Sequence, residues 1–256
     1  MAAELLALQL GIKQCPEKEL FAGISAADRS VTYVSSAYLL KSSQRTVLID
    51  TGFGSRSRAL EAGYSEYCTA AERLAQLGIE PRQISDVIIT HAHEAKIGAL
   101  AYYPQARVYI SGREIGAMEH ALEHSCDGRC PYRPEDLDLL RRLPRLVKIK
   151  NCMAVDKHVR ADVIGGYTRG FMLPTVMYSG ISRVMLASEN MPMYRHWQGE
   201  PLSSAWCSRG SDVRERLKMR TYTSFVLPGC DPLVFSRYPS AAPGVVRIIS
   251  SEMFGL

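Results

Sequence analysis

The stretch "VIITHAHEAKIGAL", residues 87–100, decides how this chain is interpreted. An apolar run is followed by His91 and His93, one residue apart. In an extended or turning segment, residues i and i+2 point the same way, so both imidazoles can face one metal ion. Further along, Ala95 offers no donor atom and Lys96 carries an ammonium. The same spacing is also typical of a polar loop with two solvated or hydrogen-bonded histidines.

The segments around this stretch alternate between strand and helix patterns. Residues 31–50, "VTYVSSAYLLKSSQRTVLID", predict two strands around the polar turn "KSSQ". The apolar spacing predicts a helix from about residue 55 to residue 77, ending at Gly78. "ISDVIIT" and "ARVYIS" predict buried strands, and "GREIGAMEHALEH" predicts a helix.

The second half continues in the same way. Strands are expected over "LVKIKNCMAV", "ADVIGG", "FMLPTVMYSG", "SRVMLAS", "TSFVLPG" and "GVVRIIS", and a helix over "GSDVRERLKMR". We find no internal repeat and no linker. This pattern of strands and helices therefore predicts a single α/β or α+β domain over residues 1–256, with a lid or insertion around residues 120–145.

Composition excludes several classes of protein. Of 256 residues, 46% are hydrophobic and 22% charged, which is ordinary for a soluble globular protein. The net charge of +5 is scattered, so no nucleic-acid partner is expected. No segment is long enough to span a membrane, and the N-terminus lacks the basic region of a signal peptide. We therefore expect a cytoplasmic protein whose seven dispersed cysteines are free thiols.

The order of motifs resembles a known superfamily. "TVLIDTGFG", "VIITHAHEAKIGAL" and "ARVYISGREI" resemble the metallo-β-lactamase superfamily, whose members carry T-H-x-H-x-D-H-x-G. "IGGYTRG" is similar to its P-G-H-T-x-G segment, "VMLASENMPMYRHW" to the strand that ends in the metal-bridging aspartate, and "FVLPGCDPLVFSRYP" to its G-H-D-P segment. Over about residues 5–240 the pattern resembles the N-acyl homoserine lactonase branch.

The resemblance implies an αββα sandwich of two mixed β-sheets flanked by helices, with the site at one edge. Family enzymes hold two metal ions there. Carried over to this chain, His91 and His93 remain as ligands of the first metal, and Glu189 stands at the bridging carboxylate. Two imidazoles and one carboxylate suit a single zinc or iron(II) ion.

Four other ligand positions hold different residues. Ala95 stands for the aspartate, and Lys96, Tyr167 and Cys230 each stand for a histidine. Because Ala95 has no donor atom and the ammonium of Lys96 repels a cation, we expect that no second metal ion binds. The Lys96 ammonium can then stabilise an oxyanion in that ion's place. The alternative is a protein that binds no metal at all, for which a pair between Glu189 and the ammonium would argue.

Two further residues are candidates for catalysis. Tyr194 follows Glu189 by five residues and is expected to assist a substrate carbonyl, or merely to pack. Cys230 is expected to be either a nucleophile, with its pKa lowered near Lys96, or a small buried hydrophobe.

A separate constellation comprises His120, His124, Cys126 and Cys130. The two histidines are spaced i, i+4 on an expected helix, so they share a face. The group is either a relocated zinc site or ordinary side chains on an exposed helix.

These residues support a leading function and two alternatives. The leading hypothesis is a hydrolase acting on a small lactone, ester or thioester of secondary metabolism, with at most one metal held by His91, His93 and Glu189. In it, Lys96, Tyr167 and Tyr194 orient or polarise the substrate carbonyl. The alternatives are a non-catalytic binding protein that keeps the pocket, and a metal-free catalyst of cyclisation or elimination that uses Lys96, Tyr167 and Cys230. The partner is a small molecule in each case, and a homodimer is expected by analogy with the lactonase branch.

Overall fold

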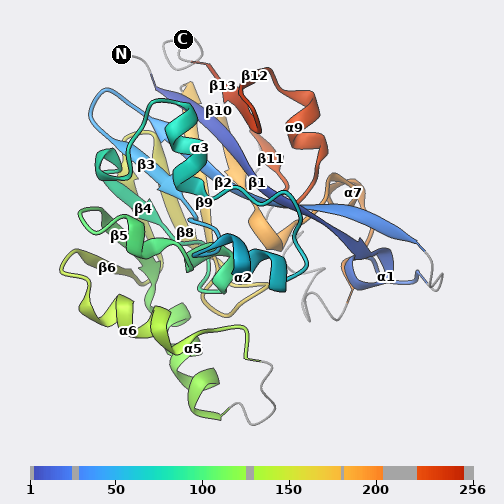
Figure 1. Cartoon of the computed structure of the whole chain (residues 1–256), viewed down its shortest axis with the longest axis horizontal. Coiled ribbons are helices and arrows are strands. Elements are labelled where there is room, and N and C mark those ends of the chain that lie inside the picture. The colour runs from blue at the N-terminus through green and yellow to red at the C-terminus, as the bar shows by residue number, and fades with distance from the viewer. Residues whose placement is uncertain (1–2, 25–28, 125–129, 180–181, 204–223, 251–256) are drawn as a thin grey trace.

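The computed structural model describes residues 3–24, 29–124, 130–179, 182–203 and 224–250. Two β-sheets lie against each other, and helices cover the outside (Figure 1). Both sheets combine parallel and antiparallel pairs. The predicted fold class, with two mixed sheets and flanking helices, is confirmed.

The first sheet has the strand order β12-β13-β1-β2-β3-β4-β5-β6 within the described residues. Its strands are β1 (Glu4–Pro16), β2 (Ser30–Lys41), β3 (Thr46–Ile49), β4 (Asp86–Ile88), β5 (Arg107–Ser111), β6 (Leu146–Ile149), β12 (Ser240–Ala242) and β13 (Val245–Ile249). From β3 to β6 the neighbours are parallel. The carboxyl ends of these four strands therefore meet at one edge.

The second sheet has the order β11-β10-β9-β8-β7 within the described residues. Its strands are β7 (Cys152–Asp156), β8 (Val159–Val163), β9 (Met172–Ser179), β10 (Ser182–Leu186) and β11 (Ser224–Leu227). Only β10 and β11 are parallel in this set.

Helices cover one face of the first sheet. The described α-helices are α1 (Glu17–Leu20), α2 (Arg56–Glu61), α3 (Ala70–Gln76), α4 (Glu94–Ile97), α5 (Gly112–His124), α6 (Pro134–Arg142), α7 (Tyr194–Gln198) and α9 (Leu233–Arg237). Short 3-10 helices are η1 (Pro81–Gln83), η2 (Leu100–Tyr102) and η3 (Ser188–Asn190). Apolar residues of α2, α3, α5 and α6 share one core cluster with residues of the first sheet. No helix in the described ranges is long and apolar enough to cross a membrane.

The alternation of side chains along the strands explains the layers. In β3, Leu48 packs under the helices, whereas Val47 and Ile49 face the second sheet. Val176 of β9 and Val184 of β10 lie in the same inner cluster. A period of two residues thus gives the first sheet two buried faces.

The prediction of one continuous helix over residues 55–77 is wrong, because the middle of this range is not helical. α2 ends before Gly63, whose φ is +82°, and α3 begins only after Thr69. Between them, Tyr64 and Tyr67 turn into the core beside Phe53. The capping box at the start of α3 restarts the helix.

Of the other predictions from the sequence, some are confirmed and others are not. The strands predicted over residues 31–50 are present with the turn between them. The 13-residue β1 was not predicted. The segment predicted as helix "GSDVRERLKMR" lies outside the described residues. The single domain and its lid stay predictions, although α5 and α6 occupy that part of the chain.

Candidate functional site

The candidate site lies where β3 and β4 end side by side. Their parallel pairing places the residues that follow, Asp50 and Thr90, at the same edge. The Asp50 carboxylate accepts hydrogen bonds from the Thr90 backbone N–H at 2.8 Å and from its hydroxyl at 2.9 Å. Asp50 has a φ of 61°, a left-handed conformation that aspartate tolerates better than most residues. These bonds hold the start of the "THAHEAKIG" segment against the aspartate turn.

The two histidines of this segment lie next to each other. The ring centroids of His91 and His93 are 4.7 Å apart, and the Nδ1 atom of His91 is 3.2 Å from the Thr90 hydroxyl. His91 is buried and His93 is partly exposed. Desolvation lowers the pKa of His91 well below its ordinary value and that of His93 to about 4. Both imidazoles are therefore neutral at pH 7.

Lys96, on α4, is buried between two carboxylates. Its ammonium lies 3.2 Å from Oε1 of Glu189 and 3.7 Å from Oδ2 of Asp50, and only 2% of the side chain is exposed. It also donates to the backbone carbonyl of Ser36 at 3.5 Å. Burial acts to lower the pKa of Lys96, but the two carboxylates outweigh it and raise the pKa above its ordinary value. Lys96 is therefore a permanent cation.

Glu189 reaches the site from the second sheet. It lies in η3, directly after β10, and accepts hydrogen bonds from the hydroxyls of Ser188 and Tyr33. Burial acts to raise the pKa of Glu189, but the charge of Lys96 overcomes it and holds the pKa at about 2. A Cβ on Gly229 would lie 2.3 Å from the Cα of Ser188, so only glycine lets the loops after β10 and β11 pass so closely.

Tyr167 covers the histidines. Its ring centroid lies 5.2 Å from the rings of both His91 and His93. The loop is held by Asn190, whose side-chain oxygen accepts from the Tyr167 backbone N–H at 2.6 Å. The structure thus brings together the predicted residues His91, His93, Lys96, Tyr167 and Glu189.

Glu114, which the sequence did not single out, organises the surroundings of the histidines. One carboxylate oxygen accepts from the Ala92 backbone N–H at 3.0 Å and from the Tyr132 hydroxyl at 3.2 Å. The other accepts from the Thr168 hydroxyl at 2.7 Å and from the Gly170 backbone N–H at 3.0 Å. Burial raises the pKa of Glu114 although these four donors oppose the rise. One carboxylate therefore joins three segments around the site.

Cys230 is close to the site but does not have the chemistry predicted for a nucleophile. The side chain is buried with 1% exposure. Burial, followed by the charge of Glu189, raises the pKa of the Cys230 thiol well above its ordinary value. The lowered pKa predicted from the neighbouring Lys96 is wrong, because burial and the charge of Glu189 outweigh the opposing charge of Lys96.

Tyr194 points toward a different part of the molecule. Its ring is stacked with the Arg237 guanidinium at 4.4 Å, and its hydroxyl is hydrogen-bonded to Tyr238. Its backbone N–H donates to Asp231 at 2.8 Å. No described contact joins Tyr194 to Glu189. A role in assisting a carbonyl at the histidines stays a prediction.

The second constellation is only partly described. The rings of His120 and His124 stack at 4.3 Å, and Nδ1 of His124 lies 2.8 Å from the His120 carbonyl oxygen. Cys130 is a free, partly buried thiol, and Cys126 lies outside the described residues. The relocated zinc site stays a prediction.

The residues gathered at the strand ends do not fit a metal centre. Within the described ranges, no three His, Cys, Asp or Glu side chains are arranged to hold an ion. The nearest approach between the predicted ligands His91 and Glu189 is 3.9 Å, and the other oxygen of Glu189 faces Lys96. The ammonium takes the carboxylates that a metal ion would need and repels a second cation. The metal content itself stays a prediction.

Comparison with known proteins agrees with the fold. A family model described as the metallo-beta-lactamase superfamily matches residues 31–128, which include Asp50, both histidines and Lys96. The match covers less than half of the chain, so the chain is similar to this superfamily over that segment. Among curated members, the N-acyl homoserine lactonase AiiB of Agrobacterium fabrum is 28% identical over 165 residues. A probable metallo-hydrolase of Mycobacterium tuberculosis is 27% identical over 94 residues.

The coverage of these superfamily relatives is partial. The match to AiiB spans 57% of this chain and 59% of the lactonase, and the match to the mycobacterial protein spans 32% and 30%. Solved structures match over more of the chain. A quorum-quenching N-acyl homoserine lactone lactonase has a TM-score of 0.77 at 16% identity, over 96% of this chain and 99% of that one. The dizinc lactonase AidC has a TM-score of 0.70 at 18% identity, over 97% and 94%. At these identities the likeness shows the fold.

The ion pair of Lys96 generates a prediction about stability. Lys96→Met is expected to lower the free energy of unfolding by about 3–5 kcal/mol, because it leaves two buried carboxylates without their cation. Urea unfolding followed by circular dichroism measures the change. Lys148→Met, at an exposed position of β6, is the control and is expected to change the value by less than about 0.5 kcal/mol. A cost of under about 1 kcal/mol for Lys96→Met would show that the pair does not hold the site.

Glu114 generates a second prediction. In Glu114→Gln, an amide NH₂ faces two hydrogen-bond donors, so we expect a loss of about 2–4 kcal/mol in unfolding free energy. Glu119→Gln on the same helix is the matched control. Its exposed pair with Arg141 contributes at most about 1 kcal/mol. Equal effects of the two substitutions would contradict the organising role of Glu114.

Asp50 generates a prediction about pH. Burial raises the pKa of Asp50 from 3.8 to about 6, although Lys96 and Thr90 act to lower it. The folded protein therefore holds this proton more tightly than the unfolded chain, and the resulting stability is present at pH 4 and lost as pH rises through about 6. We expect the unfolding free energy of the parent, relative to Asp50→Asn, to fall between about pH 4 and 7. A flat difference across that range would refute the shift.

Proposed function

We propose that this chain binds a small molecule carrying a lactone, ester or thioester group, and does so without the metal centre of its hydrolytic relatives. The observation that carries the proposal is the 3.2 Å contact between the Lys96 ammonium and Glu189. A metal ion at this place would have to displace a buried cation that is covalently part of the chain. The cost of leaving that ammonium unpaired is several kcal/mol.

Two groups of the site, Glu189 and His93, are poor general bases at neutral pH. A general base works best with a pKa near the operating pH. Glu189, at about 2, and His93, at about 4, lie well below it. The Cys230 thiol, with its pKa raised by burial, is protonated and is a weak nucleophile. These pKa shifts favour binding of the ligand over its hydrolysis.

A cavity beside the candidate site offers room for such a ligand. It has a volume of about 270 Å³ and is lined by Phe21, Val31, Thr32, Met193, Tyr194, Arg195, Gln198, Asp231, Pro232, Leu233 and Arg237. Thr32 and Asp231 of its lining are the chain neighbours of Tyr33, which donates to Glu189, and of Cys230. Arg195 is already paired with Glu17 and Glu200, so the exposed Arg237 is the arginine available to a ligand carbonyl.

Hydrolysis of the same class of ligand is the second candidate. It is favoured by the neutral state and the 4.7 Å separation of the His91 and His93 rings, because a neutral imidazole is the form that binds a metal. It requires that Lys96 give up Glu189, which the described geometry does not show.

Metal content measured together with ligand binding separates the two candidates. Protein purified without a histidine tag is expected to contain under about 0.1 equivalent of zinc or iron, to bind N-hexanoyl homoserine lactone or a simple thioester by calorimetry, and to hydrolyse neither. Arg237→Gln is expected to weaken binding by about tenfold. A double substitution, Ala95→Asp with Lys96→His, restores two ligands of the family motif and is expected to take up zinc.

The opposite results have defined meanings. About one equivalent of metal in the parent that is lost in His91→Ala, with lactone hydrolysis, would replace the proposal by the second candidate. Neither metal nor binding of either probe would reject both.

A further inference from the structure

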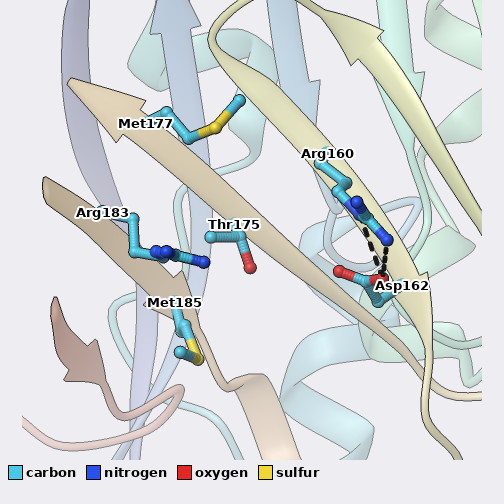
Figure 2. Close-up of a pocket in the computed structure, with 6 residues that line it drawn as sticks. All are labelled: Arg160, Asp162, Thr175, Met177, Arg183 and Met185. Atoms are coloured by element: carbon cyan, nitrogen blue, oxygen red, sulfur yellow. Dashed lines mark hydrogen bonds and ion pairs between the residues drawn. The ribbon is translucent and has the colours of Figure 1, made fainter. Parts of the chain in front are cut away.

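A second cavity lies on the outer face of the five-stranded sheet. It has a volume of about 330 Å³, and its described lining comes from three neighbouring strands, β8, β9 and β10 (Figure 2). The lining residues are Arg160, Asp162, Thr175, Met177, Arg183 and Met185. None of them belongs to the candidate site described above, so the cavity has to be explained separately.

Strand register explains why these side chains gather on one face. Thr175 pairs with Arg160 on one side and with Met185 on the other, and Met177 pairs with Arg183. Directly paired residues point to the same side of a sheet. The intervening residues, such as Val176 and Val184, face the core between the sheets. The cavity is therefore a regular product of the pleat.

The charges in the cavity are unequal. Arg160 donates through two nitrogens to one oxygen of Asp162, at 3.0 and 3.1 Å, so these two charges compensate each other. Arg183 has no ion pair within the described part of the chain, and its Nε–H is buried without a hydrogen-bond partner. Figure 2 shows the Arg183 side chain extending from β10 toward Thr175 on β9. One positive charge and one buried donor thus remain for an acceptor.

We propose that this cavity binds a small carboxylate with a short apolar chain. The carboxylate accepts from Arg183, whose guanidinium presents several donors to a planar anion. The apolar chain lies against Met177, which is 37% exposed, above Met185, which is 1% exposed and packs in a core cluster with Leu173 and Val226. Methionine adapts to apolar ligands of different shape. Asp162 compensates the charge of Arg160, so only the positive charge of Arg183 faces the ligand uncompensated. A dianion such as phosphate is therefore disfavoured.

Methionine methyl signals in NMR report on this cavity directly. Protein labelled with ¹³C at the methionine methyl groups is titrated with hexanoate, and the signals are assigned with Met177→Leu and Met185→Leu. We expect hexanoate to shift both signals saturably in the millimolar range, and the uncharged isostere hexanamide to shift neither. Arg183→Gln is expected to weaken hexanoate binding at least about tenfold. Arg107→Gln, at an exposed arginine of β5, is the matched control and is expected to change nothing.

Three results would overturn the proposal. Hexanoate that moves neither signal up to about 10 mM means that the cavity does not bind this class of ligand. Hexanamide or inorganic phosphate that shifts the signals as strongly as hexanoate means that a carboxylate with an apolar chain is not what the cavity recognises. The comparison of hexanoate with hexanamide uses the parent protein, so it decides the question even if Arg183→Gln fails to fold.

Discussion

The ammonium of Lys96 lies 3.2 Å from Glu189 and 3.7 Å from Asp50, with almost no access to water. A buried charge is tolerated only when it is paired, so the elements that carry its partners must meet around it. Asp50 follows β3 of the first sheet, Glu189 follows β10 of the second, and Lys96 lies on α4. The pair therefore ties the two sheets together at the edge where the strands end. The family resemblance places metal ions at this edge, whereas here a cation that belongs to the chain holds the carboxylates.

Much of this arrangement was predictable from the sequence because it depends on local patterns. Apolar runs interrupted by polar turns indicated most of the strands, and the parallel β3 and β4 bring Asp50 and the histidine segment to one edge. The order of motifs added His91, His93 and Glu189 from distant parts of the chain. Even the pair of Lys96 with Glu189 was foreseen as the alternative to a metal. All of these predictions depend on where the strands end and on the order of the motifs along the chain.

The rest could not be predicted because it depends on three-dimensional packing. Nothing in the sequence near Glu114 indicates that four donors from three segments converge on its carboxylate. A helical pattern over residues 55–77 gave no sign that Tyr64 and Tyr67 would turn into the core. The pKa of Cys230 depends on the balance of burial, Glu189 and Lys96 in the folded chain, and the orientation of the Tyr194 ring depends on its contact with Arg237 of α9.

The two cavities differ in the elements that line them. The cavity beside Tyr194 is lined by residues of α7 and α9, the start of β2 and neighbouring loops. The cavity on the outer face is built from strand interiors, so its shape follows from the pleat and its chemistry from single residues such as Arg183. The two cavities share no lining residue, so substitutions in one can be tested without altering the lining of the other.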